Sequence, residues 1–209
     1  MKISIIDYSI GNVQSIINAL CDDDVETILT DNEKIILDAD AVILPGVGAF
    51  NKAMDELSKR NIPKILSEFI KTGKPLLGIC LGMQLLLEES EEFGRTEGLG
   101  FCEGRVKKFP TNTEVRFPHV SWNELLIKND KKQVNLLDNI KETNSFYFVH
   151  SFVCVPKNQS EVLATTNYGN HEFCSVLKKD NIYGCQFHPE KSGIYGNKIL
   201  KNFIKIAKK

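Results

Sequence analysis

The sequence lacks the features that mark several classes of protein. Its 26 lysines and arginines nearly balance 27 aspartates and glutamates, which leaves a formal charge of −1 and no net field to attract nucleic acid or an anionic membrane. Its longest uncharged apolar run, at 41–50, contains a proline and glycines and is far shorter than the roughly 20 residues of a membrane helix. We therefore expect neither a membrane span nor a nucleic-acid partner.

The six cysteines and four histidines also lack recognisable patterns. No two cysteines form a C-x-x-C pair, and no histidine has the spacing of a metal ligand. The first residues lead into a strand pattern without the features of a signal peptide. We therefore expect reduced thiols in a cytoplasmic protein that uses no metal and no other cofactor.

The first half of the chain alternates short apolar runs with amphipathic stretches. This pattern is typical of parallel strands that are buried on both faces and connected by helices. Strands are expected at 3–7, 25–29, 41–44 and 75–79, and helices at 12–21, 50–59, 62–71 and 83–89, with a break or change of direction at Pro63. The sequence therefore predicts the α/β class with a central, mostly parallel sheet.

The second half has a different pattern. Segments 146–150 and 162–166 alternate in a way that indicates an added antiparallel or mixed sheet region. A late buried strand is expected at 182–187 and an amphipathic helix at 195–207. No linker separates the two halves, so we expect residues 1–209 to form a single domain.

The segment GICLG (78–82) has the form GxCxG, the thiol counterpart of the GxSxG turn that carries a nucleophile between a strand and a helix. The glycines remove side-chain bulk, so Cys80 can occupy a tight backbone geometry. The start of the helix favours the thiolate, and the Leu81 amide can face an oxyanion. A buried cysteine is usually a small apolar core residue. That interpretation suits the other five cysteines, whereas the glycine frame favours a nucleophile at Cys80.

A base and its partner are expected at the end of the late strand, in QFHPE (186–190). His188 and Glu190 occupy alternate positions of an extended chain and so project to the same side. Pro189 favours an extended His188, so the carboxylate can hold one ring nitrogen while the other faces a thiol. We therefore predict a triad of Cys80, His188 and Glu190. His150 has no neighbouring carboxylate, and we expect it to form a wall of the site.

At this point the sequence resembles the class I, or triad, glutamine amidotransferases, and among them the glutaminase subunits of imidazole glycerol phosphate synthases. The resemblance runs nearly end to end and rests on motifs in the family's order: DYSIGN (7–12), LPGVGAF (44–50), GICLGMQ (78–84), EESEE (88–92), PHVSWN (118–123), YFVHS (147–151) and QFHPEK (186–191). It implies the class I glutamine amidotransferase fold and hydrolysis of glutamine to glutamate and ammonia.

The resemblance also implies a mechanism and a set of site residues. The Cys80 thiolate attacks the glutamine amide, and His188 protonates the departing ammonia and then activates water against the glutamyl thioester, while Glu190 orients His188. The backbone amides of Val47 and Leu81 would form the oxyanion hole. The substrate-binding residues would be Gly48, Gln84, His150 and Ser151.

The family passes its ammonia to a partner, a (β/α)8 barrel cyclase, in a heterodimer that makes imidazole glycerol phosphate and aminoimidazole carboxamide ribotide for histidine biosynthesis. The resemblance therefore implies a partner interface beside the active site. The positions that carry over to it are Asn12, Trp122, Asn123, Tyr147 and Lys191.

Ser9 and Ser121 stand where the family usually has glycine, and both lie near the expected interface. They leave open a related glutaminase subunit that supplies a sugar or nucleotide amidotransferase. A catalytically silent interaction subunit is a second alternative, against which the intact triad argues. A cysteine peptidase is a third, against which Gln84 and the Pro-Gly-Val-Gly loop argue.

Overall fold

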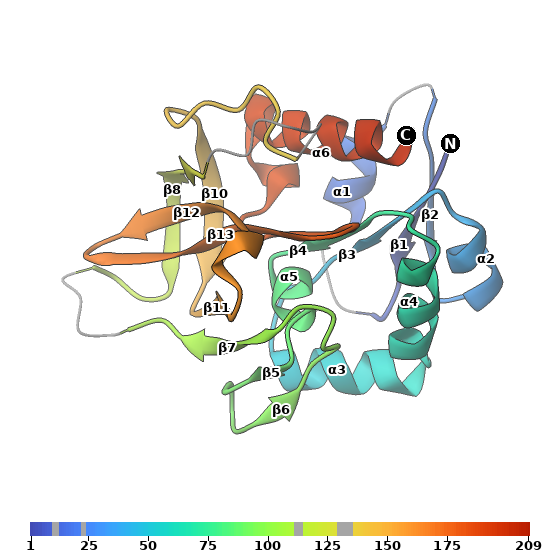
Figure 1. Ribbon diagram of the computed structural model, residues 1–209, viewed down its shortest axis with the longest axis horizontal. Coiled ribbons are helices and arrows are strands. Elements are labelled where there is room, and N and C mark those ends of the chain that lie inside the picture. Colours follow the sequence, from blue (N-terminus) through green and yellow to red (C-terminus); the bar gives the residue numbers. More distant parts are fainter. Residues whose placement is uncertain (10–12, 22–23, 111–114, 129–135) are drawn as a thin grey trace.

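A mixed sheet with helices on both faces organises the chain (Figure 1). The computed structural model describes residues 1–9, 13–21, 24–110, 115–128 and 136–209. Within these ranges the helices are α1 (Val13–Ala19), α2 (Glu33–Asp38), α3 (Phe50–Lys59), α4 (Ile62–Lys71), α5 (Leu81–Leu85) and α6 (Gly193–Ala207), with 3-10 turns η1 (Gln159–Glu161) and η2 (Pro189–Lys191). None of these helices is long and apolar enough to cross a bilayer.

The strands of the largest sheet follow the order β2-β1-β3-β4-β14-β13-β12-β9. Pairing is parallel from β2 to β14 and antiparallel from β14 to β9. These strands are β1 (Lys2–Ile6), β2 (Glu26–Thr30), β3 (Ala41–Leu44), β4 (Leu76–Ile79), β9 (Leu126–Ile127), β12 (Val162–Tyr168), β13 (His171–Lys179) and β14 (Ile182–Cys185). The predicted α/β class and the change to antiparallel strands in the second half are confirmed.

Two smaller sheets flank the antiparallel half. One has the order β11-β7-β5-β6, and the other pairs β10 with β8 in antiparallel register. Their strands are β5 (Glu89–Ser90), β6 (Thr96–Glu97), β7 (Gly104–Lys108), β8 (His119–Glu124), β10 (Ser145–His150) and β11 (Phe152–Pro156). Figure 1 shows these sheets beside the end of the central sheet where β4 leads into α5.

The helices cover the central sheet with two apolar clusters. Ile16 of α1 and Phe203 of α6 belong to one cluster with Ile5 of β1. Leu57 of α3 and Leu66 of α4 belong to the second cluster, on the other face. Because parallel strands are covered on both faces, β3 and β4 are buried along their whole length. Each buried Val, Ile or Leu side chain of these strands contributes about 1.5–3 kcal/mol by burial.

The limits of the predicted elements are confirmed in part. Strand β3 and helices α3 and α4 occupy the predicted ranges. The two helices separate at Asn61, whose φ is 58°, and Pro63 lies in the first turn of α4, where its missing N–H is not needed. The helix predicted at 83–89 is confirmed only at 83–85, because α5 spans Leu81–Leu85 and Glu89–Ser90 pairs with β7 as a strand. Helix α2 has no counterpart among the elements predicted from the sequence.

The turn between β4 and α5 is packed against the end of β3. A Cβ added at Gly82 would overlap the carbonyl oxygen of Leu44, and one added at Gly78 would lie 2.7 Å from the carbonyl oxygen of Gly82. These distances are too short for nonbonded contacts. The two glycines are therefore required by close packing around Cys80.

Gly82→Ala is expected to destabilise the fold by about 3 kcal/mol, since the neighbouring backbone would have to move. Gly73→Ala is the matched control. Its Cβ meets no atom, and its cost is the left-handed φ of 80° alone, about 1 kcal/mol. Urea unfolding midpoints measure both changes. A Gly82→Ala protein as stable as Gly73→Ala would contradict the packing argument.

Candidate active site

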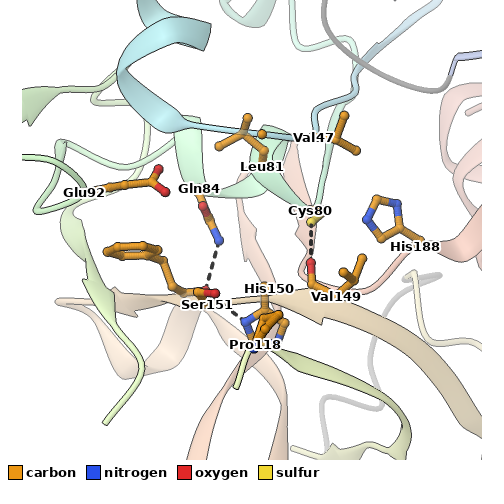
Figure 2. Close-up of a pocket in the computed structure, with 12 residues that line it drawn as sticks. Val47, Cys80, Leu81, Gln84, Glu92, Pro118, Val149, His150, Ser151 and His188 are labelled. Atoms are coloured by element: carbon orange, nitrogen blue, oxygen red, sulfur yellow. Dashed lines mark hydrogen bonds between the residues drawn. The ribbon is translucent and has the colours of Figure 1, made fainter. Parts of the chain in front are cut away.

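A cavity of about 310 Å³ lies where β3 and β4 end and the two smaller sheets begin (Figure 2). Carboxyl ends of parallel strands are the usual binding edge of an α/β sheet. The lining residues that the sequence analysis singled out are Val47, Gly48, Cys80, Leu81, Gln84, His150, Ser151 and His188. The lining residues that it did not single out are Glu92, Pro118, Val149 and Phe152.

Cys80 occupies a strained position between β4 and α5. Its φ of 53° and ψ of −109° place it in the left-handed half of conformational space, which a non-glycine residue rarely adopts. Its N–H bonds the carbonyl of Cys185 at 2.8 Å and so extends the pairing of β4 with β14. The sulfur is directed into the cavity, 3.8 Å from the carbonyl oxygen of Val149. A sharp strand-to-helix turn therefore presents the thiol to the pocket.

His188 and Glu190 form a buried pair next to this thiol. Nδ1 of His188 donates to Oε1 of Glu190 at 2.7 Å, and the two side chains are 3% and 2% exposed. They meet for a reason other than the predicted alternation of a strand, because β14 ends at Cys185 and Glu190 lies in η2. His188 itself remains extended, with φ −96° and ψ 97°. The 3-10 turn after it brings the carboxylate back to the ring.

Backbone contacts fix the position of His188. Its N–H donates to the carbonyl of Tyr147 at 2.9 Å. The Ser192 hydroxyl donates to the carbonyl of His188 at 2.6 Å and accepts from the N–H of Tyr147 at 2.9 Å. Figure 2 shows the imidazole beside Cys80. Because Nδ1 is held by Glu190, the other nitrogen, Nε2, is available to the thiol side of the cavity.

The charge of His188 is set by its two neighbours. Burial of the ring disfavours the imidazolium, but the Cys80 sulfur and the Glu190 carboxylate outweigh that effect and raise the pKa of His188 from 6.5 to about 10. His150, in contrast, is buried against His119, and burial together with that neighbour lowers the pKa of His150 to about 3. At neutral pH the pocket therefore holds one imidazolium and one neutral imidazole.

Two backbone segments line the cavity with residues expected to supply oxyanion amides. Leu81 is the first residue of α5, and the first N–H groups of a helix have no partner inside it. Val47 and Gly48 follow β3, and Gly48 has a φ of 95° that favours glycine. The buried Tyr8 hydroxyl donates to the carbonyl of Pro45 at 2.6 Å. That bond anchors the start of the loop that carries the Val47 amide.

The side chains of the far wall are bonded to one another. The carbonyl oxygen of Phe152 accepts from Nε2 of Gln84 at 3.0 Å and from Nδ1 of His150 at 2.9 Å. Nε2 of His150 meets Nδ1 of His119 at 2.8 Å, and the opposite nitrogen of His119 meets the Asn123 side chain at 2.8 Å. Both ring nitrogens of His150 are thus engaged, and the structure places it in the wall.

Glu92 is a pocket residue that the sequence analysis did not single out. Its carboxylate accepts from the N–H of Phe50 at 2.7 Å and faces the cavity opposite the thiol (Figure 2). The run EESEE gives no signal for which carboxylate faces inward, because the short strands around it are set by pairing with β7. The described residues hold no group of three or more His, Cys, Asp or Glu side chains able to bind a metal.

The chain matches known proteins along almost its whole length. Residues 4–207 match the family model "Glutamine amidotransferase class-I". Proteins named imidazole glycerol phosphate synthase subunit HisH are 44% identical in Prochlorococcus marinus, over 98% of this chain and 98% of the relative, and 42% identical in Aquifex aeolicus, over 100% and 99%. The chain is a class I glutamine amidotransferase of the HisH family.

Solved structures support the fold of this HisH-family chain. A structure described as a glutamine amidotransferase has a TM-score of 0.74 at 18% identity and covers 99% of each chain. PurLQS from Thermotoga maritima also has a TM-score of 0.74, at 17% identity over 98% of this chain and 97% of that one. At these identities the likeness concerns the architecture, and it confirms the class I glutamine amidotransferase fold.

Two of the expected interface residues of the HisH-family chain, Trp122 and Tyr147, lie side by side on β8 and β10. Trp122 is 54% exposed, and its ring lies 5.9 Å from that of its strand partner Tyr147. Asn123 is bonded to His119, and Lys191 is exposed at the end of η2. Asn12 lies outside the described residues.

The two serines at family glycine positions have different settings. Ser9 has a φ of 63°, in the region that favours glycine, and its hydroxyl accepts from the Arg60 guanidinium at 3.0 Å. Ser121 lies on β8, and its hydroxyl donates to the carbonyl of Trp122 at 3.4 Å. The structure thus supplies a reason for glycine in the family at position 9 but none at position 121.

Glu190→Gln is expected to lower the pKa of His188 by about 1–3 units, because the carboxylate that favours the imidazolium is lost. In the parent, the stability gained from the imidazolium is complete below the ordinary pKa of 6.5 and is lost as pH rises through about 10. Histidine ring NMR as a function of pH measures the titration directly.

Glu92→Gln is the control for this substitution, since it removes a pocket carboxylate that bonds the Phe50 amide instead of His188. It should leave the His188 titration in place. A His188 ring that still titrates near pH 10 in Glu190→Gln would show that the carboxylate does not hold the charge.

Proposed function

We propose that this chain is the glutaminase subunit of an imidazole glycerol phosphate synthase, with Cys80 as nucleophile, His188 as acid and base, and Glu190 as the group that orients His188. The observation that carries the proposal is the meeting of a strained cysteine turn with a buried His–Glu pair at one pocket. The HisH relatives, which are 41–46% identical over nearly the full chain, supply the reaction class.

The first half of the reaction uses the sulfur and the imidazolium. The Cys80 thiolate attacks the side-chain carbonyl carbon of glutamine, and the N–H groups of Leu81 and Val47 donate hydrogen bonds to the oxygen on which negative charge develops. As the C–N bond breaks, the imidazolium of His188 gives its proton to the departing nitrogen, which leaves as ammonia. A glutamyl thioester and a neutral imidazole remain.

The second half of the reaction restores the starting charges. The neutral His188 takes a proton from a water molecule, whose oxygen attacks the thioester carbon. The C–S bond then breaks, glutamate leaves and the sulfur departs as the thiolate beside the renewed imidazolium. Glu190 favours that imidazolium throughout, since its oxygen lies 2.7 Å from Nδ1.

The pocket suits a small amino acid with a charged end. Its volume of about 310 Å³ lies at the small end of the roughly 300–1,000 Å³ of ligand pockets. Glu92 faces the cavity across from Cys80 and offers a carboxylate to the α-ammonium of glutamine. Gln84 is committed to the wall through Phe152, so it would shape the pocket more than hold the substrate.

The outward face of β8 and β10 suits the cyclase partner. Val120 and Trp122 on β8 are 51% and 54% exposed, and their strand partners are Val149 and Tyr147. These four residues form an apolar strip, and the carbonyls of its β10 members bond the Cys80 thiol and the His188 amide. A (β/α)8 barrel docked there would receive ammonia at the pocket and form imidazole glycerol phosphate and aminoimidazole carboxamide ribotide in the cytoplasm.

Cys80→Ala is expected to lower the rate of glutamine hydrolysis by about 10⁴-fold or more, because no other group can form the thioester. Cys21→Ser is the matched control, since Cys21 is an exposed free thiol away from the cavity. It should retain full activity. Glutamate release measured by a coupled assay tests both variants, and glutamine hydrolysis that persists in Cys80→Ala would refute the mechanism.

The barrel cyclase from the same genome, with its ribotide ligand, is expected to accelerate glutamine hydrolysis by this chain. Trp122→Ala should raise the cyclase concentration needed for half-maximal stimulation by about tenfold or more, as for a central aromatic interface residue. Val155→Ala removes a 41% exposed apolar side chain from β11 and serves as control. No stimulation by the cyclase would favour a different acceptor, such as a sugar or nucleotide amidotransferase.

A further inference from the structure

Gln186 is a buried side chain that reaches the sulfur of Cys80. It follows β14, is fully buried, and its N–H bonds the carbonyl of Ser175 at 2.9 Å. Its side-chain nitrogen Nε2 lies 3.7 Å from Sγ of Cys80, a distance that suits a large acceptor atom. The triad mechanism uses His188 and Glu190 and gives Gln186 no task.

The direction of this contact is fixed by the groups around it. A carbonyl oxygen can only accept hydrogen bonds, so the carbonyl of Phe152 requires that Gln84 turn its Nε2 towards it, at 3.0 Å. The same nitrogen lies 3.1 Å from Oε1 of Gln186. Gln186 therefore turns its oxygen to Gln84 and its N–H to Cys80.

The opposite orientations are excluded by the same contacts. If the amide of Gln186 alone were rotated, two NH₂ groups would face each other and its oxygen would face the sulfur. If Gln84 were rotated as well, its oxygen would face the carbonyl of Phe152, which is already bonded to Nδ1 of His150 at 2.9 Å. The first arrangement places two donors opposite each other, and the second places two acceptors opposite each other. The donor side of Gln186 thus faces the nucleophile.

The sulfur therefore lies between one group that favours the protonated thiol and one that favours the thiolate. The carbonyl of Val149, 3.8 Å away, accepts only from the protonated thiol. The N–H of Gln186 bonds the thiolate more strongly than the thiol, because a charged acceptor strengthens a hydrogen bond. Loss of the Gln186 donor would leave the Val149 carbonyl unopposed on that side of the sulfur.

We propose that Gln186 is a further catalytic residue, whose side-chain N–H holds the Cys80 sulfur as the thiolate for attack and receives the thiolate again when the thioester breaks. The proposal rests on the nucleophilic role of Cys80 described above. It assigns Gln84 a positioning role. Nε2 of Gln84 bonds both the Phe152 carbonyl and Oε1 of Gln186, and so keeps the N–H of Gln186 turned towards Cys80. No proton moves through Gln186, whose amide stays neutral.

Gln186→Met tests the proposal, since methionine keeps the length and burial of glutamine and lacks its N–H donors. The measurement is the rate at which iodoacetamide alkylates Cys80 from pH 5 to pH 11, followed by peptide mass spectrometry. We expect the rate at pH 7 to fall about tenfold. The whole profile should move to higher pH and reach the parent's plateau, since ionisation of the sulfur is affected and access to it is not.

Two further variants make the result decisive. Gln186→Asn keeps the amide but withdraws it from the sulfur, so its profile should move in the same direction. Ser175→Ala changes a fully buried side chain on the neighbouring strand and should leave the profile in place. Thermal unfolding verifies that each variant is folded. A substitution that only disturbed packing would lower the plateau rate of Cys80 alkylation and leave its dependence on pH unchanged.

Unchanged profiles in folded Gln186→Met and Gln186→Asn would overturn the proposal. Failure of the underlying mechanism would look different, because Cys80→Ala would then still hydrolyse glutamine whatever the Gln186 variants do. A profile that moves to higher pH in the Gln186 variants, with Cys80→Ala inactive, supports both the mechanism and the added donor.

Discussion

The site depends on the parallel pairing of β4 with β14. Ile79 and Cys185 are partners in this register, and the N–H of Cys80 continues the ladder to the carbonyl of Cys185 at 2.8 Å. The pairing sets the cysteine turn beside the segment that carries Gln186 and His188, although Cys80 and Gln186 are 106 positions apart in the chain. Since parallel strands end at one edge, nucleophile and base leave the sheet together.

The carbonyl of Phe152 gives the far wall its polarity. Its oxygen lies within hydrogen-bond distance of both Gln84 and His150. Because a carbonyl oxygen can only accept, both side chains must turn a donor nitrogen towards it. The same nitrogen of Gln84 donates to Oε1 of Gln186, and the opposite nitrogen of His150 is bonded to Nδ1 of His119. One backbone oxygen thus orients two series of polar side chains, one through Gln84 and one through His150. This arrangement is economical in a buried site, where each polar group left without a partner costs about 1–3 kcal/mol.

Much of this architecture could be predicted from local sequence patterns. The limits of α3 and α4 follow from apolar spacing, and the cysteine turn follows from Gly78 and Gly82. The pairing of His188 with Glu190 also follows from the sequence, although a 3-10 turn produces it. What escaped prediction depends on contacts between distant segments.

The short helix α5 shows why such contacts escape a local pattern. Residues 86–89 have helical character in sequence, but the pairing of β5 with β7 draws Glu89 into a sheet. Glu92 and Gln186 carry no local signal for the same reason. Glu92 lines the pocket because the turn after β5 brings it there, and Gln186 reaches the sulfur while its oxygen is held by Gln84 of α5.

The two histidines of the pocket show that neighbours, and not residue type, decide the chemistry. Burial disfavours the charged form of both rings. His188 has the Glu190 carboxylate on one nitrogen and the Cys80 sulfur as its other neighbour, so the effect of burial is overcome and the imidazolium is stable. His150 has a carbonyl on one nitrogen and a second imidazole on the other. A carbonyl favours a proton only weakly, and His119 would repel a charge. Only His188 can therefore supply a proton to departing ammonia at neutral pH, while His150 remains a fixed, neutral wall.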